Sequence, residues 1–368
     1  MTPRIVVVGK GLAGAMVAWK FAGRGCQISW WSGGQHCASE VAAGMFNPVS
    51  FRRIVEVWNA GQHLAEMRAT LLDMEETLGL KGQLLHDVPV AKVFANGDYR
   101  DTWDARWEEG HGVCQWASIG EDLAVAHLPN VQGPAGVGKV HAAGWVDVPA
   151  LLQAMEAHFE LHHNVEHQTW KVDDGLPEGA DAVVDCRGVG AADELFQVGV
   201  QIHPNHGDVL TLSTPLEGPH ALDSGGHTLN NGKWLLPTHR QSGRQHWRLG
   251  ATYAWHKTKA SPDGHAAEEL RTHMAKVWDG ASRDAWGNAQ LEKHEAGLRP
   301  ASPDRRPMVG PWPGQPKGVL MLNGLGTRGV LVGPSASLAL VRWWMDGVPI
   351  PKEMGLSRFK AVRERFQD

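Results

Sequence analysis

Cysteine is scarce in this chain of 368 residues, and the few cysteines lie far apart. The four are Cys26, Cys37, Cys114 and Cys186. None forms a CxxC or CxxH spacing, which argues against a zinc site and a disulfide framework and is typical of a reducing, cytoplasmic setting. The cluster of His162, His163 and His167 lacks a convincing carboxylate partner, so we expect no metal ion.

A long apolar run and an excess of positive charge are also missing. No stretch approaches the ~20 apolar residues of a membrane span, and the apolar run 5–8 is too short for a signal peptide. We therefore expect neither export nor membrane insertion. The 35 Lys and Arg residues against 40 Asp and Glu give a formal charge of −5, which favours neither nucleic acid nor an anionic membrane as a partner. The sequence gives no indication of the oligomeric state.

What is present is a pattern of alternating strands and helices long enough for two domains, because single cores stop growing at about 250 to 300 residues. The β-branched run 5–8 predicts a buried parallel strand, followed by a helix from Leu12 and a second strand over 27–31. Further helices are expected at about 55–78, with Gly79 as the C-cap, at 146–159, opened by Asp147, and at about 266–277. Strands are expected at 181–185 and, of a different sheet, within 83–138 and 206–253.

Between the first strand and helix stands a glycine loop of the GxGxxG type, with Leu12 and Ala13 inside it. Gly9 permits the tight turn, Gly11 lets backbone N–H groups approach a pyrophosphate, and Gly14 lets helix and strand pack closely. Because this loop lies between a predicted strand and a predicted helix, it indicates a dinucleotide site. The acidic residue expected after the second strand is replaced by Ser32, whose hydroxyl binds a ribose more weakly than a carboxylate. Its alternative role is that of a turn residue.

NAD and FAD share this loop, so the rest of the chain must decide between them. The segment SEVAAGMFNPVSFRR, residues 39–53, resembles the second cofactor-contacting stretch of the D-amino-acid oxidase and glycine oxidase superfamily of FAD-dependent oxidoreductases. DAVVDCRGVGA and WRLGATY resemble later stretches of that family, and GLRPASPDRRPMVG and LNGLGTRGVLVGPSAS its paired closing motifs. The resemblance implies an α/β fold with a Rossmann-like FAD-binding domain of the GR2/DAO type, residues 1–82, 139–205 and 291–368. A mixed-sheet α+β substrate domain would then comprise 83–138 and 206–290.

The resemblance assigns three groups of residues to non-covalently bound FAD. Around the pyrophosphate and flavin edge these are Ala42, Ala43, Gly44 and Asn47. Near the adenosine they are Trp170, Cys186, Arg187 and Gly188. Past the flavin pyrimidine they are Gly324, Gly326, Thr327, Arg328, Gly329 and Val330. The helix that starts after Arg328 would stabilise negative charge at the reduced flavin.

For the substrate, Arg299 matches the family arginine that receives a carboxylate at the flavin, because a guanidinium fork binds carboxylates bidentately. The alternative for Arg299 is a structural salt bridge with Asp304. Tyr253 and His206 are further catalytic candidates, although such residues at strand ends are more often structural. Arg52 and Arg53 are either ligands of phosphate, flavin or substrate, or a solvated pair.

The implied reaction is oxidation of the C–N bond of an amine or amino acid. The resemblance implies hydride transfer from the substrate carbon to flavin N5, hydrolysis of the imine, and electron transfer to O2 or another acceptor. No general base is required if the substrate amine is neutral. Three alternatives stay open: a flavin domain acting on a larger amine such as a modified tRNA side chain, an NAD(P)-dependent enzyme sharing only the glycine loop, and a flavin-binding module without catalysis.

Overall fold

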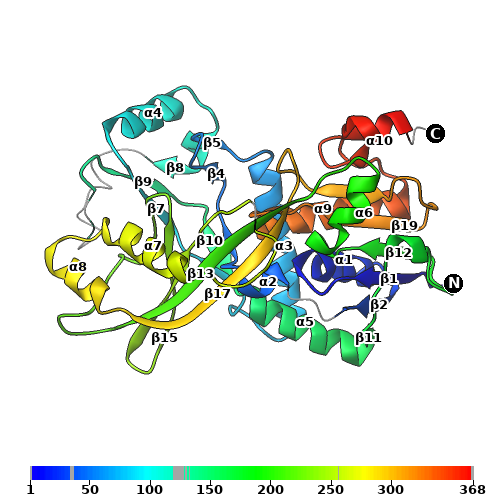
Figure 1. Ribbon diagram of the computed structural model, residues 1–368, viewed down its shortest axis with the longest axis horizontal. Helices are drawn as coiled ribbons and strands as arrows, with labels where there is room; N and C mark the ends of the chain where they lie inside the picture. Colours follow the sequence, from blue (N-terminus) through cyan, green and yellow to red (C-terminus); the bar gives the residue numbers. More distant parts are fainter. Residues whose placement is uncertain are drawn as a thin grey trace.

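The computed structural model describes residues 2–33, 37–118, 128, 131, 133–255 and 257–365. Its first layer is a six-stranded sheet in the order β11-β2-β1-β12-β19-β18, in which every neighbouring pair is parallel except β18 with β19 (Figure 1). The strands are β1 (Arg4–Val8), β2 (Gln27–Trp31), β11 (Asn164–Glu166), β12 (Ala182–Asp185), β18 (Met308–Pro311) and β19 (Val319–Asn323).

The central strands of this sheet are buried on both faces because they are largely apolar. In β1, Ile5 and Val7 pack into one core, whereas Val6 and Val8 pack into another on the opposite face. The first core also contains the apolar sides of α1 (Leu12–Ala22), α3 (Ala60–Thr77), α5 (Val148–His162) and α9 (Gly329–Asp346). The second core contains residues of the short helices α6 (Ala192–Gln197) and α10 (Lys360–Arg365).

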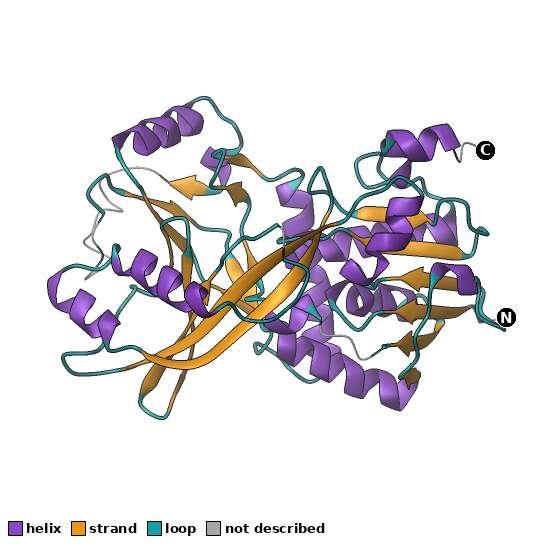
Figure 2. Cartoon of the chain, viewed as in Figure 1, coloured by secondary structure: helices purple, strands orange, loops and turns teal. Residues whose placement is uncertain are grey.

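The second layer is a mixed eight-stranded sheet in the order β17-β13-β16-β15-β14-β7-β9-β8. Its strands are β7 (Val90–Val93), β8 (Ala117–Ser118), β9 (Val137–Val140), β13 (His203–Pro215), β14 (Thr228–Asn230), β15 (Trp234–Gln241), β16 (Arg244–Gly250) and β17 (Gln290–Ala301). The long antiparallel pair β13 and β17 runs from this sheet towards the six-stranded one (Figure 2). Helices α7 (Gly264–Ala275) and α8 (Gly280–Gly287) contribute to the core of this layer.

Two small sheets and two further helices accompany the two large sheets. A three-stranded sheet contains β3 (Met45–Phe46), β10 (Gly144–Val146) and β6 (Leu85–Asp87), and a two-stranded sheet contains β4 (Val49–Ser50) and β5 (Val55–Glu56). The remaining helices are α2 (Ala38–Val41) and α4 (Gly97–Glu108). Within the described ranges, every helix is too short or too polar to cross a membrane.

The predicted α/β class and the early βαβ unit are confirmed, but several element bounds are wrong. The helix expected from residue 55 begins at Ala60, because residues 55–56 pair with β4 and Asn59 takes a left-handed conformation with φ 48°. It ends as expected before Gly79, which has φ 68°. Helix α5 begins after its predicted cap, since the Asp147 side chain accepts a hydrogen bond from the Ala150 N–H (3.1 Å).

Helices α4 and α8 were missed, because only strands were expected in the first region and nothing was assigned to the second. The Asn96 side chain caps α4 by accepting from the Tyr99 N–H at 2.9 Å. Part of the region 83–138, including residues 119–127, lies outside the described residues. The two predicted domain limits stay a prediction.

Candidate functional site

Four of the predicted cofactor segments lie at the carboxyl edge of the six-stranded sheet. Strands β2, β1, β12 and β19 are adjacent and parallel, so their carboxyl ends lie side by side. These ends are followed by Ser32, by the glycine loop, by residues 186–188 and by residues 324–330 respectively. Open parallel sheets bind their ligands beyond the carboxyl ends of the strands. The fold therefore brings together predicted cofactor segments that are more than 300 positions apart in sequence.

The glycine loop has no room for side chains. A Cβ on Gly14 would lie 1.8 Å from the Gly9 carbonyl oxygen, and one on Gly9, where φ is 115°, would lie 2.5 Å from the Cys186 carbonyl oxygen. A Cβ on Gly11 would meet Cys37 Sγ at 2.8 Å. The N-cap residue Gly11 presents the α1 N-terminus without a capping side chain. This helix start, with its positive dipole and no capping by its own N-cap residue, fits the pyrophosphate of a dinucleotide.

The segment from α2 to β3 packs against the glycine loop and the second sheet. The Leu12 N–H donates to Ser39 Oγ at 3.0 Å, and Arg248 on β16 donates to the Val41 carbonyl oxygen at 2.7 Å. Gly44 has φ 68°, and a Cβ there would lie 1.8 Å from the Val146 carbonyl oxygen. The small Ala42 and Ala43, both partly buried, precede it. The segment therefore lies between the two layers, where a flavin edge is expected.

Asn47 has a local role in the turn that follows this segment. Its side-chain oxygen accepts a hydrogen bond from the Val49 N–H at 3.1 Å. A carboxamide in this position stabilises the turn into β4. A contact of Asn47 with FAD would have to use its other atoms and stays a prediction.

At the adenosine end, the side chain of Arg187 is occupied by the protein itself. It donates to Asp185 (2.8 Å) and Glu194 (2.6 Å), and its guanidinium lies 5.0 Å from the Trp170 ring centre. The Arg187 backbone N–H also donates to Asp185, at 3.0 Å, so a contact of Arg187 with FAD stays a prediction. Burial raises the pKa of the neighbouring Cys186 thiol well above its ordinary value, which keeps this thiol protonated at neutral pH.

Two other predicted adenosine contacts are placed at the same end of the sheet. The partly buried Ser32 donates its N–H to the Glu166 carbonyl oxygen at 3.0 Å. Gly188 has φ 59° and follows the carboxyl end of β12. Residues 34–36, directly after Ser32 and Gly33, lie outside the described residues. A contact of Ser32 with the ribose therefore stays a prediction.

Asn323 joins two of the predicted cofactor loops and was missed in the sequence. Its side chain donates to the Gly188 carbonyl oxygen (3.0 Å) and accepts from the Gly324 N–H (2.8 Å). Gly326, with φ 55°, donates its N–H to the Pro300 carbonyl oxygen at 2.9 Å. The loop of Thr327 and Arg328 then enters α9, whose first turn contains Gly329 and Val330. Only its position at the end of the last parallel strand could have indicated a role for Asn323.

Arg299 projects from β17, opposite Asn205 of β13. It donates to the Asn205 side-chain oxygen at 2.9 Å, and its guanidinium carbon lies 5.1 Å from the centre of the Tyr253 ring. Burial lowers the pKa of Arg299, although a guanidinium stays cationic at neutral pH. The alternative of a salt bridge with Asp304 is wrong, because Asp304 pairs with Arg358 at 2.7 Å.

Gly207 creates the space for this guanidinium and was also missed. A Cβ on Gly207 would lie 2.1 Å from Arg299 Nη2. The glycine is on β13, two residues from Asn205 and therefore on the same face of the strand. No signal in the sequence distinguishes it from other strand glycines, because its role depends on the register between β13 and β17.

The two other catalytic candidates have different surroundings. Tyr253 is 53% exposed and stands beside Arg299, as a pocket wall would. The His206 ring is fully buried, with Nε2 3.0 Å from the Ser261 carbonyl oxygen and Nδ1 3.5 Å from Asp208. This placement gives His206 a structural role, and we leave it out of the proposed reaction.

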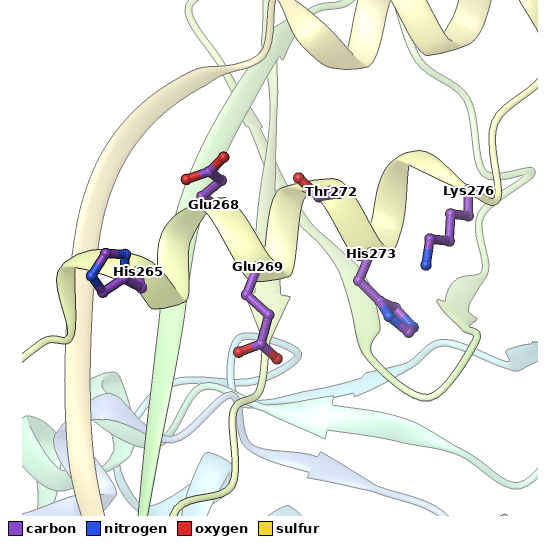
Figure 3. A pocket seen from close by; sticks show the side chains of 6 residues that line it. All are labelled: His265, Glu268, Glu269, Thr272, His273 and Lys276. Carbon is purple, nitrogen blue, oxygen red and sulfur yellow. The ribbon is translucent and has the colours of Figure 1, made fainter.

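A surface hollow elsewhere on the molecule has no such chemistry. Its lining residues project from α7 and the residue after it (Figure 3): His265, Glu268, Glu269, Thr272, His273 and Lys276. Glu269 pairs with Lys233 at 2.8 Å, and His273 Nε2 lies 3.1 Å from the Asn231 carbonyl oxygen. We interpret it as a solvated helix face. In the described part of the chain, no group of three or more His, Cys, Asp or Glu residues is arranged to hold a metal ion.

Comparison with known proteins agrees with the arrangement at the sheet edge. The FAD dependent oxidoreductase family, DAO, matches residues 4–343. The glycine oxidase of Pseudomonas aeruginosa is 25% identical over 373 residues, which cover 94% of this chain and 96% of that enzyme. The tRNA 5-methylaminomethyl-2-thiouridine biosynthesis bifunctional protein MnmC of Paracidovorax citrulli is 25% identical over 389 residues. That match covers 96% of this chain but only 59% of the bifunctional protein.

The fold itself matches a solved structure. The crystal structure of glycine oxidase from Geobacillus kaustophilus gives a TM-score of 0.76 at 22% identity and covers 98% of this chain and 99% of that one. The family match also decides between the two dinucleotides that share the glycine loop. The chain belongs to the family of FAD-dependent oxidoreductases, and FAD is its cofactor.

Proposed function

We propose that this protein oxidises the carbon–nitrogen bond of an amine that carries a carboxylate, such as an amino acid. The observation that supports this most directly is Arg299. Its guanidinium is largely buried, yet it forms no direct ion pair within the described residues. The nearby Asp208 carboxylate, which opposes the lowering of the Arg299 pKa, is held by Thr252 and His294 instead. A buried cation without a directly paired counter-ion is costly, so such a position favours an anionic ligand.

The surroundings of Arg299 fix its direction without neutralising it. Its Nη1 donates to the Asn205 side chain and, at 3.4 Å, to the Thr252 carbonyl oxygen. These neutral acceptors use one nitrogen of the fork, which leaves the other N–H groups for a carboxylate. Gly207 keeps the space beside Nη2 free of side-chain atoms. We infer that the carboxylate binds here and that Tyr253 covers one side of it.

FAD, when bound, accepts the two electrons and the hydrogen that leave the substrate carbon. The contribution of the chain is to bind and to orient. Arg299 fixes the substrate through its carboxylate, and the first-turn N–H groups of α9 stabilise negative charge nearby. We assign no general base, because a substrate amine bound in its neutral form needs none.

The test is anaerobic bleaching of the flavin absorbance. We expect glycine or another small amino acid to bleach the wild-type protein. Arg299→Ala should keep the flavin bands but bind carboxylated substrates about 100-fold more weakly or worse, because truncating one partner of a buried charge pair costs about 2 to 5 kcal/mol. The exposed Arg363→Ala is the matched control and should behave as wild type.

The same measurement separates the rival substrates. Reduction kinetics with amino acids that are unchanged in Arg299→Ala would remove this residue from its role. The bifunctional tRNA-modifying relative matches nearly the whole chain, so tRNA bearing a modified amine is included as a substrate. Bleaching by that tRNA alone, with none by any free amino acid or N-methylated amine, would contradict the proposal of a small-molecule substrate.

A further inference from the structure

A second group of arginines lies close to Arg299. Arg328 is the N-cap residue of α9, while Arg305 lies in the turn after β17 and Arg53 in the turn between β4 and β5. These three are referred to as the arginine cluster. Burial, and after it the positive charges of Arg305 and Arg53, lower the pKa of Arg328. Arg305 and Arg53 are therefore each near enough to Arg328 to repel its charge.

The backbone explains why these distant residues meet. Ala301 forms an antiparallel bridge with Leu325, which sets the turn after β17 beside the loop that enters α9. The guanidinium of Arg306 in that turn lies 5.1 Å from the ring centre of Trp58, just after β5. Arg305 has φ 61°, an uncommon backbone conformation for a residue other than glycine. Three chain segments are thus held together with an arginine on each.

The cluster has no counter-charge within the described residues. Arg53, Arg305 and Arg328 form no ion pair there, and the closest acidic residue in sequence, Asp304, is taken up by Arg358. Asp304 also accepts from Ser302 Oγ at 3.2 Å and from the Arg306 N–H at 3.1 Å. With its oxygens so occupied, this carboxylate does not neutralise the cluster.

Tyr253 lies close to Arg299 and to Arg328 of the cluster. It interacts electrostatically with both Arg299 and Arg328, and it is half exposed. The neighbouring Trp255 is 48% exposed as well. Pro300, next to Arg299, accepts a hydrogen bond from the Gly326 N–H at 2.9 Å, so the backbone sets Arg299 beside the loop that leads to Arg328. The pyrophosphate of FAD does not use the charge of the cluster in our assignment, because it belongs at the glycine loop.

We propose that the arginine cluster is a second anion site, so the preferred substrate is an amine with two anionic groups, one bound by Arg299 and one by Arg53, Arg305 and Arg328. This rests on the proposed function. The second group is a carboxylate or a phosphonate at the far end of a short substituent on the amine. The overall charge of −5 makes a local excess of three guanidiniums more selective for such a group than a generally basic surface would be.

The test compares two achiral secondary amines that differ by one charge. N-methylglycine carries one carboxylate and iminodiacetate carries two, so stereochemistry does not enter. We expect the rate of anaerobic flavin reduction at low substrate concentration to favour iminodiacetate at least tenfold. This preference should shrink as ionic strength rises, because exposed charges are screened. N-(phosphonomethyl)glycine is the third probe and distinguishes a phosphonate-selective site from a carboxylate-selective one.

Variants then test which arginines cause the preference for iminodiacetate. Arg53→Gln and Arg305→Gln should each lower it about threefold, and the double variant about tenfold, because exposed arginines contribute modestly. Arg52→Gln is the matched control: it is exposed in the same turn and removes the same charge, but no interaction with Arg328 is found for it. It should leave the preference unchanged.

Three outcomes overturn the proposal. The first is a wild-type protein that reduces both amines equally well, which rejects the second site while the proposed function stands. The second is loss of the flavin bands in Arg53→Gln and Arg305→Gln, which assigns the cluster to FAD. The third is strong inhibition of iminodiacetate oxidation by unmodified tRNA, which assigns it to nucleic-acid phosphate. If none of the amines bleaches the flavin, both the second anion site and the proposed function are rejected.

Discussion

The cofactor edge and the substrate arginine are built in different ways. At the cofactor edge, backbone meets backbone: the closest neighbours of Gly9, Gly14 and Gly44 are carbonyl oxygens. At Arg299, side chains meet across long separations, since Asn205 is 94 positions away and Thr252 is 47. One site therefore depends on a short motif at the end of a strand, and the other on the register between β13 and β17.

This difference determines how each site responds to a substitution. A carbonyl oxygen in the main chain cannot move without shifting a strand or a helix, because interiors are closely packed. The end of an arginine side chain can rotate away at a much lower cost. We therefore expect the same change, glycine to alanine, to destroy one site and only to misalign the other.

The largest effect is expected for Gly14→Ala. The new Cβ would stand 1.8 Å from the Gly9 carbonyl oxygen, which also accepts a hydrogen bond from Trp30 Nε1 at 3.0 Å. We expect the protein to be purified without flavin bands, with FAD affinity lowered at least about 100-fold. The control is Gly333→Ala in α9, where the nearest atom is 3.7 Å away. This variant should bind FAD normally, and a yellow Gly14→Ala protein would contradict the steric argument.

The same contrast explains what the sequence could predict. The glycine loop, its strand and its helix are neighbours in the chain, so their pattern is local, and the structure confirms β1 and α1 there. Arg299 could be singled out only through the family motif that contains it. Asn205 and Gly207 carry no local signal, because only strand pairing brings them to Arg299.

Elements were misjudged for a related reason. The helix was expected from residue 55 because apolar positions at helical spacing follow from Val57, yet residues 55–56 pair with β4 and form a strand. The pairing depends on a turn at residues 50–54, in which the Ile54 N–H donates to the Ser50 carbonyl oxygen at 2.7 Å. The local helical preference expected for residues 55–56 was therefore overridden by their tertiary pairing with β4. Arg53 and Arg328 were each predicted as candidate contacts, but their grouping with Arg305 was not, since the three come from separate chain segments.

A smaller effect is expected for Gly207→Ala at the substrate arginine. The new Cβ would meet Arg299 Nη2, the end of a flexible side chain, so the fold and the flavin bands should persist. Displacing the guanidinium should weaken binding of a carboxylated substrate by about 10- to 100-fold, as expected for hydrogen bonds to a charged group. Titration of bleaching against substrate concentration measures this.

Gly264→Ala, at the start of α7 and with open space around it, is the control for that measurement. It should leave substrate binding unchanged. If Gly207→Ala instead lost FAD altogether, the two sites would not be separable, and the comparison between backbone and side-chain sites would fail.

The part of the molecule around the six-stranded sheet also contains a buried polar side chain that belongs to neither the cofactor edge nor the substrate arginine. His63 on α3 is 1% exposed, and neither ring nitrogen has a hydrogen-bond partner among the described residues. Its ring packs against Trp58 with 5.1 Å between ring centres. Burial lowers the pKa of His63 from 6.5 to about 4. The neutral ring is therefore tolerated at neutral pH, but a charged ring is not.

The sign of the pH effect follows from this lowered pKa. Between pH 6.5 and about 4 the unfolded chain binds a proton at His63 that the folded chain does not, so stability falls as the pH falls through that window. From pH 8 to pH 5, wild type should lose about 2 kcal/mol more stability than His63→Leu, at about 1.36 kcal/mol per pH unit. Denaturant unfolding of the FAD-bound protein at both pH values measures the difference. The exposed His220→Gln should follow wild type. If His63→Leu loses as much stability as wild type from pH 8 to pH 5, α3 opens to water around this residue. The part of the molecule around the six-stranded sheet is then less rigid than its backbone contacts imply.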